Sequence, residues 1–177
     1  MRACTRTTAL AALTLLMPIL LAAQRRPVEL GVDGGLGIDF NGGTLTTFSV
    51  PIQSLRIGFM ASDNVSIEPS TSINILKYEG ADAIATVSLA LSGLFHFTPD
   101  RSVAQAYFRP QAGLVFITDG DDSASQLSLG GGFGVKLPVA DQMAIRLDGS
   151  FVHAFENDDF AGRNGIAALV GFSVFTH

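Results

Sequence analysis

Residues 28–40 alternate strictly between two kinds of side chain. The even set consists of Val28, Leu30, Val32, Gly34, Leu36, Ile38 and Phe40, and the odd set of Glu29, Gly31, Asp33, Gly35, Gly37 and Asp39. Successive side chains of a β-strand point to opposite faces, so this segment predicts a strand with one apolar face. Its other face is small or negatively charged, which is unusual for the water-exposed side of a soluble sheet.

The start of the chain has the three parts of a secretion signal. Arg2 and Arg6 supply a positive beginning, and residues 9–23 are almost entirely apolar and end in Leu-Ala-Ala. That run is shorter than the roughly 20 apolar residues that a membrane-spanning helix needs. We therefore expect a signal peptide at residues 1–23 and one exported domain at residues 24–177, with an anchor helix as the alternative.

The composition of the exported part excludes several chemistries. The only cysteine, Cys4, lies in the predicted signal, so disulfides, thiolate metal sites and cysteine nucleophiles are not expected. Without Arg2 and Arg6, nine of the 11 basic residues remain against 16 acidic ones, a net charge of −7. An acidic domain has no electrostatic reason to bind nucleic acid, and no cofactor motif is present.

Seven further segments repeat the alternation of residues 28–40. They cover approximately residues 47–60, 65–76, 84–97, 106–118, 127–139, 143–155 and 166–174. In the first of these seven, the apolar phase slips by one residue between Ile52 and Leu55, which predicts a β-bulge near Pro51. The mean hydropathy of +0.38, together with 19 glycines, fits apolar side chains that face lipid at every second position. The pattern predicts an all-β fold: an eight-stranded antiparallel up-and-down transmembrane β-barrel.

The connections between these segments suggest an orientation. Residues 61–64, 98–105 and 140–142 connect at the end that carries both termini. Residues 41–46, 77–83, 119–126 and 156–164 connect at the other end. Bacterial barrels have short periplasmic turns and longer outer loops, so we expect both termini in the periplasm.

Three segments give the chain a family resemblance. They are Ala-Ser-Asp-Asn-Val-Ser-Ile-Glu-Pro at residues 61–69, Ala-Asp-Gln-Met-Ala-Ile-Arg-Leu-Asp at 140–148, and the closing Val-Gly-Phe-Ser-Val-Phe at 170–175. With eight alternating segments, the chain resembles the OmpA/OmpX-type small outer-membrane barrels. The resemblance implies a monomer of the outer membrane that contacts lipid and lipopolysaccharide and is inserted by the barrel-assembly machinery. Such chains commonly end in an aromatic residue, whereas Thr176 and His177 follow Phe175 here.

Nine charged side chains fall on the predicted lumen face. They are Glu29, Asp33, Asp39, Arg56, Glu68, Arg109, Lys136, Arg146 and Asp148. Unpaired charges inside a narrow barrel would be costly, so we expect these groups to pair. These charged groups have two interpretations. They form either a structural plug of the lumen, or a gated pore or proton path. An eight-stranded interior is just wide enough for side chains to fill, which favours the plug.

Two other candidate sites are incomplete in the sequence. A lipid A deacylase family of similar barrels has an outward histidine, a serine two residues later and an acidic partner; here His153 is followed by Phe155, and residues 165–176 contain no Asp or Glu. The acidic loop at residues 119–122 hints at calcium, but Ala124 and Gly130 replace the glycine and glutamate that an EF-hand requires. We therefore predict no catalytic, cofactor or metal site, and expect a solvated acidic loop.

These observations favour a structural or surface-interaction protein of the outer membrane. A barrel enzyme that acts on outer-membrane lipid is one alternative, for which the catalytic serine is missing. The other is a secreted soluble barrel that binds a small apolar ligand, which would need an apolar interior and a polar exterior.

Overall fold

A computed structural model describes residues 26–41, 44–76, 84–119, 122–157 and 161–176. The predicted signal peptide at residues 1–23 lies outside this range. The described residues form eight strands and contain no helix long and apolar enough to cross a membrane. The strands are β1 (Val28–Asn41), β2 (Thr44–Met60), β3 (Val65–Leu76), β4 (Ile84–His96), β5 (Gln105–Asp119), β6 (Asp122–Ala140), β7 (Met143–Ala154) and β8 (Arg163–Phe175).

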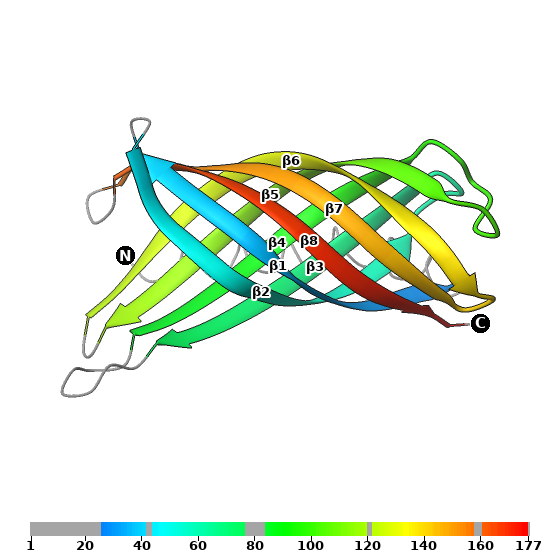
Figure 1. The fold of residues 1–177 in the computed structure, drawn as a ribbon, viewed down its shortest axis with the longest axis horizontal. Helices are drawn as coiled ribbons and strands as arrows, with labels where there is room; N and C mark the ends of the chain where they lie inside the picture. The colour runs from blue at the N-terminus through cyan, green and yellow to red at the C-terminus, as the bar shows by residue number, and fades with distance from the viewer. Residues whose placement is uncertain (1–25, 42–43, 77–83, 120–121, 158–160, 177) are drawn as a thin grey trace, which may run out of the picture.

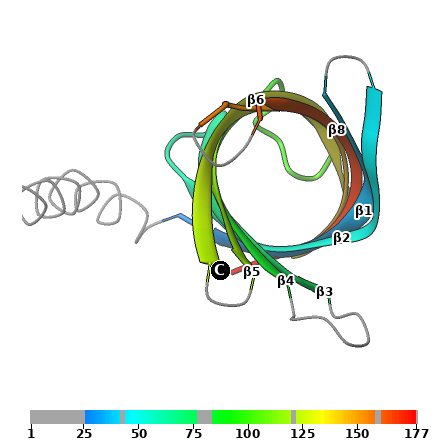
Figure 2. The same ribbon diagram turned by 90° about the vertical axis from the view of Figure 1, so that its left-hand side faces the viewer.

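Each strand pairs antiparallel with the next, and β8 returns to pair with β1, which closes the sheet (Figures 1 and 2). The closing ladder is continuous from Glu29 opposite Phe175 to Phe40 opposite Asn164. Closure removes the two free edges that an open sheet would expose. This confirms the predicted eight-stranded antiparallel up-and-down barrel, and the even strand number places both ends of the barrel domain at one end of the barrel.

The two faces of the sheet differ sharply in polarity. In β7, Ala144, Arg146, Asp148 and Ser150 are buried, while their neighbours are exposed. Arg146 is 2% exposed and the next residue, Leu147, is 42% exposed. Most of the exposed large apolar side chains lie on the strands and point outward, whereas the buried set is largely polar or charged. This arrangement suits a lipid-facing exterior and is the reverse of what a soluble ligand-binding barrel requires.

The predicted irregularity in the second segment lies beside Pro51, just before the phase slip that was placed between Ile52 and Leu55. Gly35 pairs with Ile52 and Gly37 pairs with Ser49, so β2 carries one extra residue beside Pro51. Two further register shifts occur, one next to Phe40 and one between Pro138 and Ala140. A residue without a ladder partner increases the local bend and twist of its strand, as barrel closure requires.

The segment at residues 65–76 was predicted with its observed bounds, but β2 and β6 are longer than expected. As a result, only residues 42–43 separate β1 from β2, and only residues 120–121 separate β5 from β6. The expected longer connections at residues 41–46 and 119–126 were therefore wrong. The acidic calcium-like loop falls in this region, outside the described side chains. Loop length alone does not distinguish the two ends of the barrel.

Because Leu147 lies on the exterior of β7, its replacement by arginine tests the lipid-facing assignment. We expect Leu147→Arg to destabilise the inserted barrel by about 2–4 kcal/mol if the side chain lies near the bilayer midplane. Thr98→Arg, in the exposed turn after β4, should have little effect. Denaturant unfolding in lipid vesicles measures both variants, and equal stability of the two would contradict a lipid-facing Leu147.

Candidate functional site: the ion-pair network of the lumen

The charged lumen residues gather in the half of the barrel that carries the termini. Six strands contribute charged side chains, because inward residues near the starts of β1, β3, β5 and β7 meet those near the ends of β2 and β6. β8 adds Ser173. The register sets neighbours side by side: Arg56 lies opposite Gly31, and Lys136 lies opposite Arg146. Because Lys136 and Arg146 are both positively charged, carboxylates from other strands are needed to compensate their charges.

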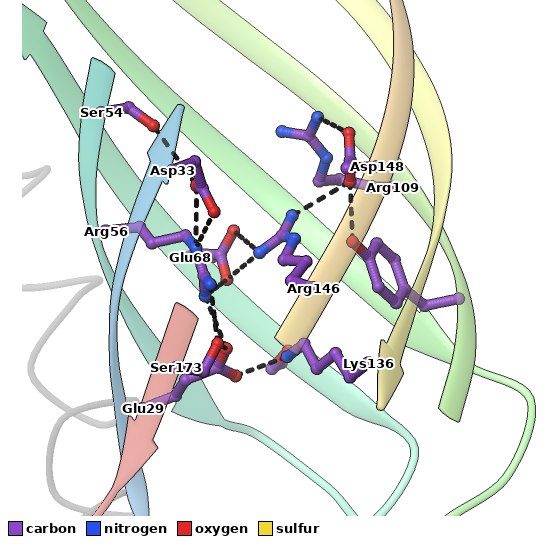
Figure 3. A network of polar contacts seen from close by, with 12 residues as sticks. Glu29, Asp33, Ser54, Arg56, Glu68, Arg109, Lys136, Arg146, Asp148 and Ser173 are labelled. Atoms are coloured by element: carbon purple, nitrogen blue, oxygen red, sulfur yellow. Dashed lines mark hydrogen bonds and ion pairs between the residues drawn. The ribbon is translucent and has the colours of Figure 1, made fainter. Parts of the chain in front are cut away.

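Arg56 is the first centre of the network (Figure 3). Its Nε donates to Asp33 Oδ2 at 2.9 Å, and its Nη1 donates to Glu29 Oε1 at 2.5 Å. Nη1 also lies 3.4 Å from Glu68 Oε2, and Nη2 donates to Ser173 Oγ at 2.6 Å. Arg56 thus links strands β1, β2, β3 and β8 through one planar guanidinium, whose fork of donors suits several acceptors at once.

Arg146 is the second centre. Its Nη1 donates to both carboxylate oxygens of Glu68 at 2.8 Å, and its Nη2 lies 3.2 Å from Asp148 Oδ2. Asp148 also accepts from Arg109 Nη2 at 2.5 Å and from the Tyr107 hydroxyl at 2.7 Å. Glu68 connects the two centres, because it contacts both Arg56 and Arg146.

The network is balanced in charge. Lys136 pairs with Glu29 through Nζ and Oε2, which brings the paired cations to four: Arg56, Arg109, Lys136 and Arg146. The four paired carboxylates are Glu29, Asp33, Glu68 and Asp148. All eight side chains are buried. Mutual pairing with added hydrogen bonds is the arrangement in which buried charges can be tolerated.

Two glycines make room for these large side chains. A Cβ at Gly31 would overlap the guanidinium of Arg56, and a Cβ at Gly134 would overlap the Tyr107 hydroxyl. Each glycine lies directly opposite the residue it accommodates, in the β1–β2 and β5–β6 ladders respectively. Glycine on the lumen face therefore provides volume for the network.

The structure brings together eight of the nine charged residues singled out in the sequence. The ninth, Asp39, lies six residues further along β1 than Asp33 and lines a lumen cavity beyond the network. Sequence reasoning missed Tyr107, which is fully buried and also lies 5.0 Å from Arg146 in a cation–π contact. The alternation of β5 could have identified it, since Tyr107 shares the inward phase with Arg109. Ser173, which accepts from Arg56, was not singled out either.

Two histidines lie outside the network. His96 Nε2 is 3.2 Å from Ser66 Oγ, but its Nδ1 is buried and has no hydrogen-bond partner in the described part of the chain. A serine–histidine pair without an acid on the second ring nitrogen lacks the group that orients and stabilises the imidazole in a catalytic triad. His153 Nδ1 lies 2.9 Å from Asn164 Oδ1 and its ring contacts Phe155 edge-on. Among the residues that the structure describes, no three His, Cys, Asp or Glu side chains are placed to hold a metal ion.

The sequence matches the family model of the outer membrane protein beta-barrel domain over residues 8–173. The chain belongs to this family. It is therefore an outer-membrane β-barrel protein, and the resemblance to small OmpA/OmpX-type barrels is confirmed. A search of curated proteins gave no match.

Solved structures of outer-membrane barrels share the fold of this family member. Neisserial surface protein A has a TM-score of 0.63 at 12% identity, with 83% of this chain and 96% of that chain covered. Ail of Yersinia pestis, in complex with a heparin analogue, has a TM-score of 0.55 at 11% identity, with 85% and 98% covered. The β-barrel domain of Pseudomonas aeruginosa OprF has a TM-score of 0.51 at 14% identity, with 82% and 96% covered. At such identities the likeness shows the fold alone.

A double-mutant cycle tests the coupling between Arg146 and Glu68. Arg146→Met leaves the buried Glu68 carboxylate with only the 3.4 Å contact to Arg56, and we expect it to destabilise the barrel by about 1–4 kcal/mol. Replacing both residues, as Arg146→Met with Glu68→Met, should cost less than the sum of the two single changes, because no buried charge is left unpaired. Ser88→Ala, on the lumen wall beyond the network, is the control. Urea unfolding in lipid vesicles provides the free energies, and additive effects would contradict the pairing.

Proposed function

We propose that this outer-membrane barrel has a structural or surface-interaction role and that its lumen is plugged by the ion-pair network. The observation that carries the proposal is the chain of contacts across the interior, from Lys136 through Glu29, Arg56, Glu68 and Arg146 to Asp148 and Arg109. It includes side chains from strands on opposite sides of the barrel. A gated pore would instead require a continuous water-filled path past these buried groups.

The proposal includes the absence of enzymatic activity. A lipid-acting barrel enzyme needs an activated nucleophile beside its base. The outward His153 contacts Asn164, and position 155 is a phenylalanine. The buried Ser66–His96 pair is closed off within the lumen, where both side chains are at most 5% exposed.

The proposed lipid partners follow from the outer surface of the barrel. Exposed Leu, Ile, Val and Phe side chains on the strands would contact the acyl chains of outer-membrane lipid and lipopolysaccharide. The barrel-assembly machinery would insert the chain. We propose a monomer, because the first and last strands pair with each other and neither is free to pair with a second copy.

For orientation, we propose that both termini are periplasmic. A signal-directed chain would enter the membrane from the periplasm, so four hairpin tips would cross the bilayer and the two ends would stay behind. The opposite orientation would require both termini and the turns beside them to cross instead.

Conductance distinguishes a plug from a pore. The unmodified protein should show no steady, large conductance in planar bilayers, because the network fills the lumen. Shortening both partners with Arg146→Ala and Glu68→Ala should raise the conductance, while Ser88→Ala should leave it unchanged. Steady conductance in the unmodified protein would rule out the plug.

Cysteine labelling tests the orientation. The exported part has no cysteine, so single replacements at Gly80, Asp121 and Asp158 provide unique thiols in the connections opposite the termini. These variants should react with an impermeant thiol reagent on intact cells. Cysteines at Asn64 and Gln142 should react only after the outer membrane is permeabilised, and the reverse pattern would invert the topology.

A further inference from the structure

One seam of the barrel is much less complete than the others. The β2–β3 ladder pairs residues from Met60 opposite Ser66 up to Leu55 opposite Thr71 and stops there. Toward the end of the barrel opposite the termini, the β2 residues that precede Leu55 pair only with β1. Residues 72–76 of β3 likewise pair only with β4 in the described strands. At every other seam, including the closing β1–β8 ladder, the pairing runs along most of the shorter strand.

This gap matters because the barrel lies in lipid. Backbone N–H and C=O groups have no partner in hydrocarbon, so spanning structures pair all of them or expose the remainder to water or polar groups. The backbone groups of β2 and β3 that face the gap therefore need polar partners. Water from the lumen, or the polar part of a bound molecule, would provide them.

Cavities lie on both sides of the same seam. On the outside, a groove of about 760 Å³ is walled mainly by apolar side chains, among them Val32, Leu55, Ile73 and Phe172. On the inside, a cavity of about 290 Å³ lies between the ion-pair network and the end opposite the termini, and serines are prominent in its wall. Ser54, Thr71 and Ser72 line both spaces.

We propose that the β2–β3 seam is a lateral binding site for a single-chain amphiphile with an uncharged, hydroxyl-bearing head. Its acyl chain would lie in the outer groove, where the walls are apolar. Its head would pass between the strands to the hydroxyl groups of Ser54, Thr71 and Ser72, and would satisfy the backbone groups that the ladder leaves open. The apolar chain matches the outer groove, and the polar head matches the inner cavity.

The charges near the seam have both signs, with Asp39, Arg109 and Arg163 in the wall of the inner cavity, so an uncharged head is the one that meets no like charge there. Asp33 also lines the outer groove, but its carboxylate already accepts from Arg56 Nε, and Ser54 Oγ donates to it at 3.3 Å. The inner cavity is small, which fits a head of glycerol size better than a phospholipid head. Arg109 belongs to both the cavity wall and the network, so a bound head would stop above the plug. The site would exchange its ligand with the membrane and not deliver it to the terminus-bearing end.

Tryptophan fluorescence can detect the bound chain, because the protein has no tryptophan of its own. Ile73→Trp places a reporter in the groove, and Phe151→Trp places one on β7, outside the groove. Both positions face outward, 63% and 47% exposed, and each lies eight residues after the start of its strand. The probe is a monoacylglycerol with a dibrominated chain, added at low mole fraction to phosphatidylcholine vesicles that contain the full exported chain.

We expect the brominated monoacylglycerol to quench Ile73→Trp more strongly than Phe151→Trp. Phosphatidylcholine and a fatty acid with the same brominated chain should show no such excess. Equal quenching of the two reporters would overturn the proposal. An equal excess with phosphatidylcholine would mean that bulk lipid fills the groove and would overturn the single-chain ligand. A stronger excess with the fatty acid would overturn the uncharged head.

Sealing the seam tests the route of the head. Continuing the register from Leu55 opposite Thr71 would place Ser54 opposite Ser72, so Ser54→Cys with Ser72→Cys should lock the gap when oxidised. The excess quenching should be lost on oxidation and return on reduction. Ser72→Phe, which fills the gap without a cross-link, should abolish it as well. An excess that survives both the Ser72→Phe change and oxidation would show groove binding alone and would overturn the lateral site.

Discussion

The pairing of β1 with β8 is the constraint on which the rest of the structure depends. A sheet in hydrocarbon cannot leave a row of backbone donors and acceptors without partners, and a closed ring of strands is the arrangement that removes its edges. Once the ladder from Glu29–Phe175 to Phe40–Asn164 is formed, strict alternation follows, because one face of every strand meets lipid and the other meets the lumen. The extra residue beside Pro51 then serves the curvature that closure demands.

Closure also explains the charges inside. Every second side chain enters a narrow interior, and the large ones fit only where glycines such as Gly31 and Gly134 lie opposite them. Apolar side chains could fill the same space at similar stability. Ion pairs differ because they depend on register: Glu68 of β3 meets Arg146 of β7 only if the intervening ladders are aligned. A one-residue slip would turn these charges toward lipid. The network therefore penalises misaligned barrels as well as stabilising the aligned one.

Alternation was enough to predict the strands because lipid and lumen impose opposite demands on neighbouring residues. The segment at residues 65–76 was predicted with its observed bounds, while β6 extends back to Asp122 through Ser and Ala residues that carry no polarity signal. The lumen face of each charged residue followed from the same period. Their partners did not, because strand stagger decides which inward residues meet. Arg146 and Asp148 share a strand face, yet the bidentate partner of Arg146 is Glu68, which comes from β3.

The same dependence on pairing explains why the incomplete seam has chemical significance. Where β2 and β3 pair, between Leu55 and Met60, the network lies directly behind them, with Arg56 on β2 and Glu68 on β3. Where the pairing stops, Ser54 of β2 and Ser72 of β3 take the place of these charged side chains, and both also line the outer groove together with Thr71. Charges at an open seam would face lipid without compensation, whereas hydroxyl groups tolerate both water and an apolar neighbour at lower cost. The polarity of β2 and β3 therefore follows the completeness of the ladder between them: ion-paired side chains where the two strands pair, and hydroxyl groups where they do not.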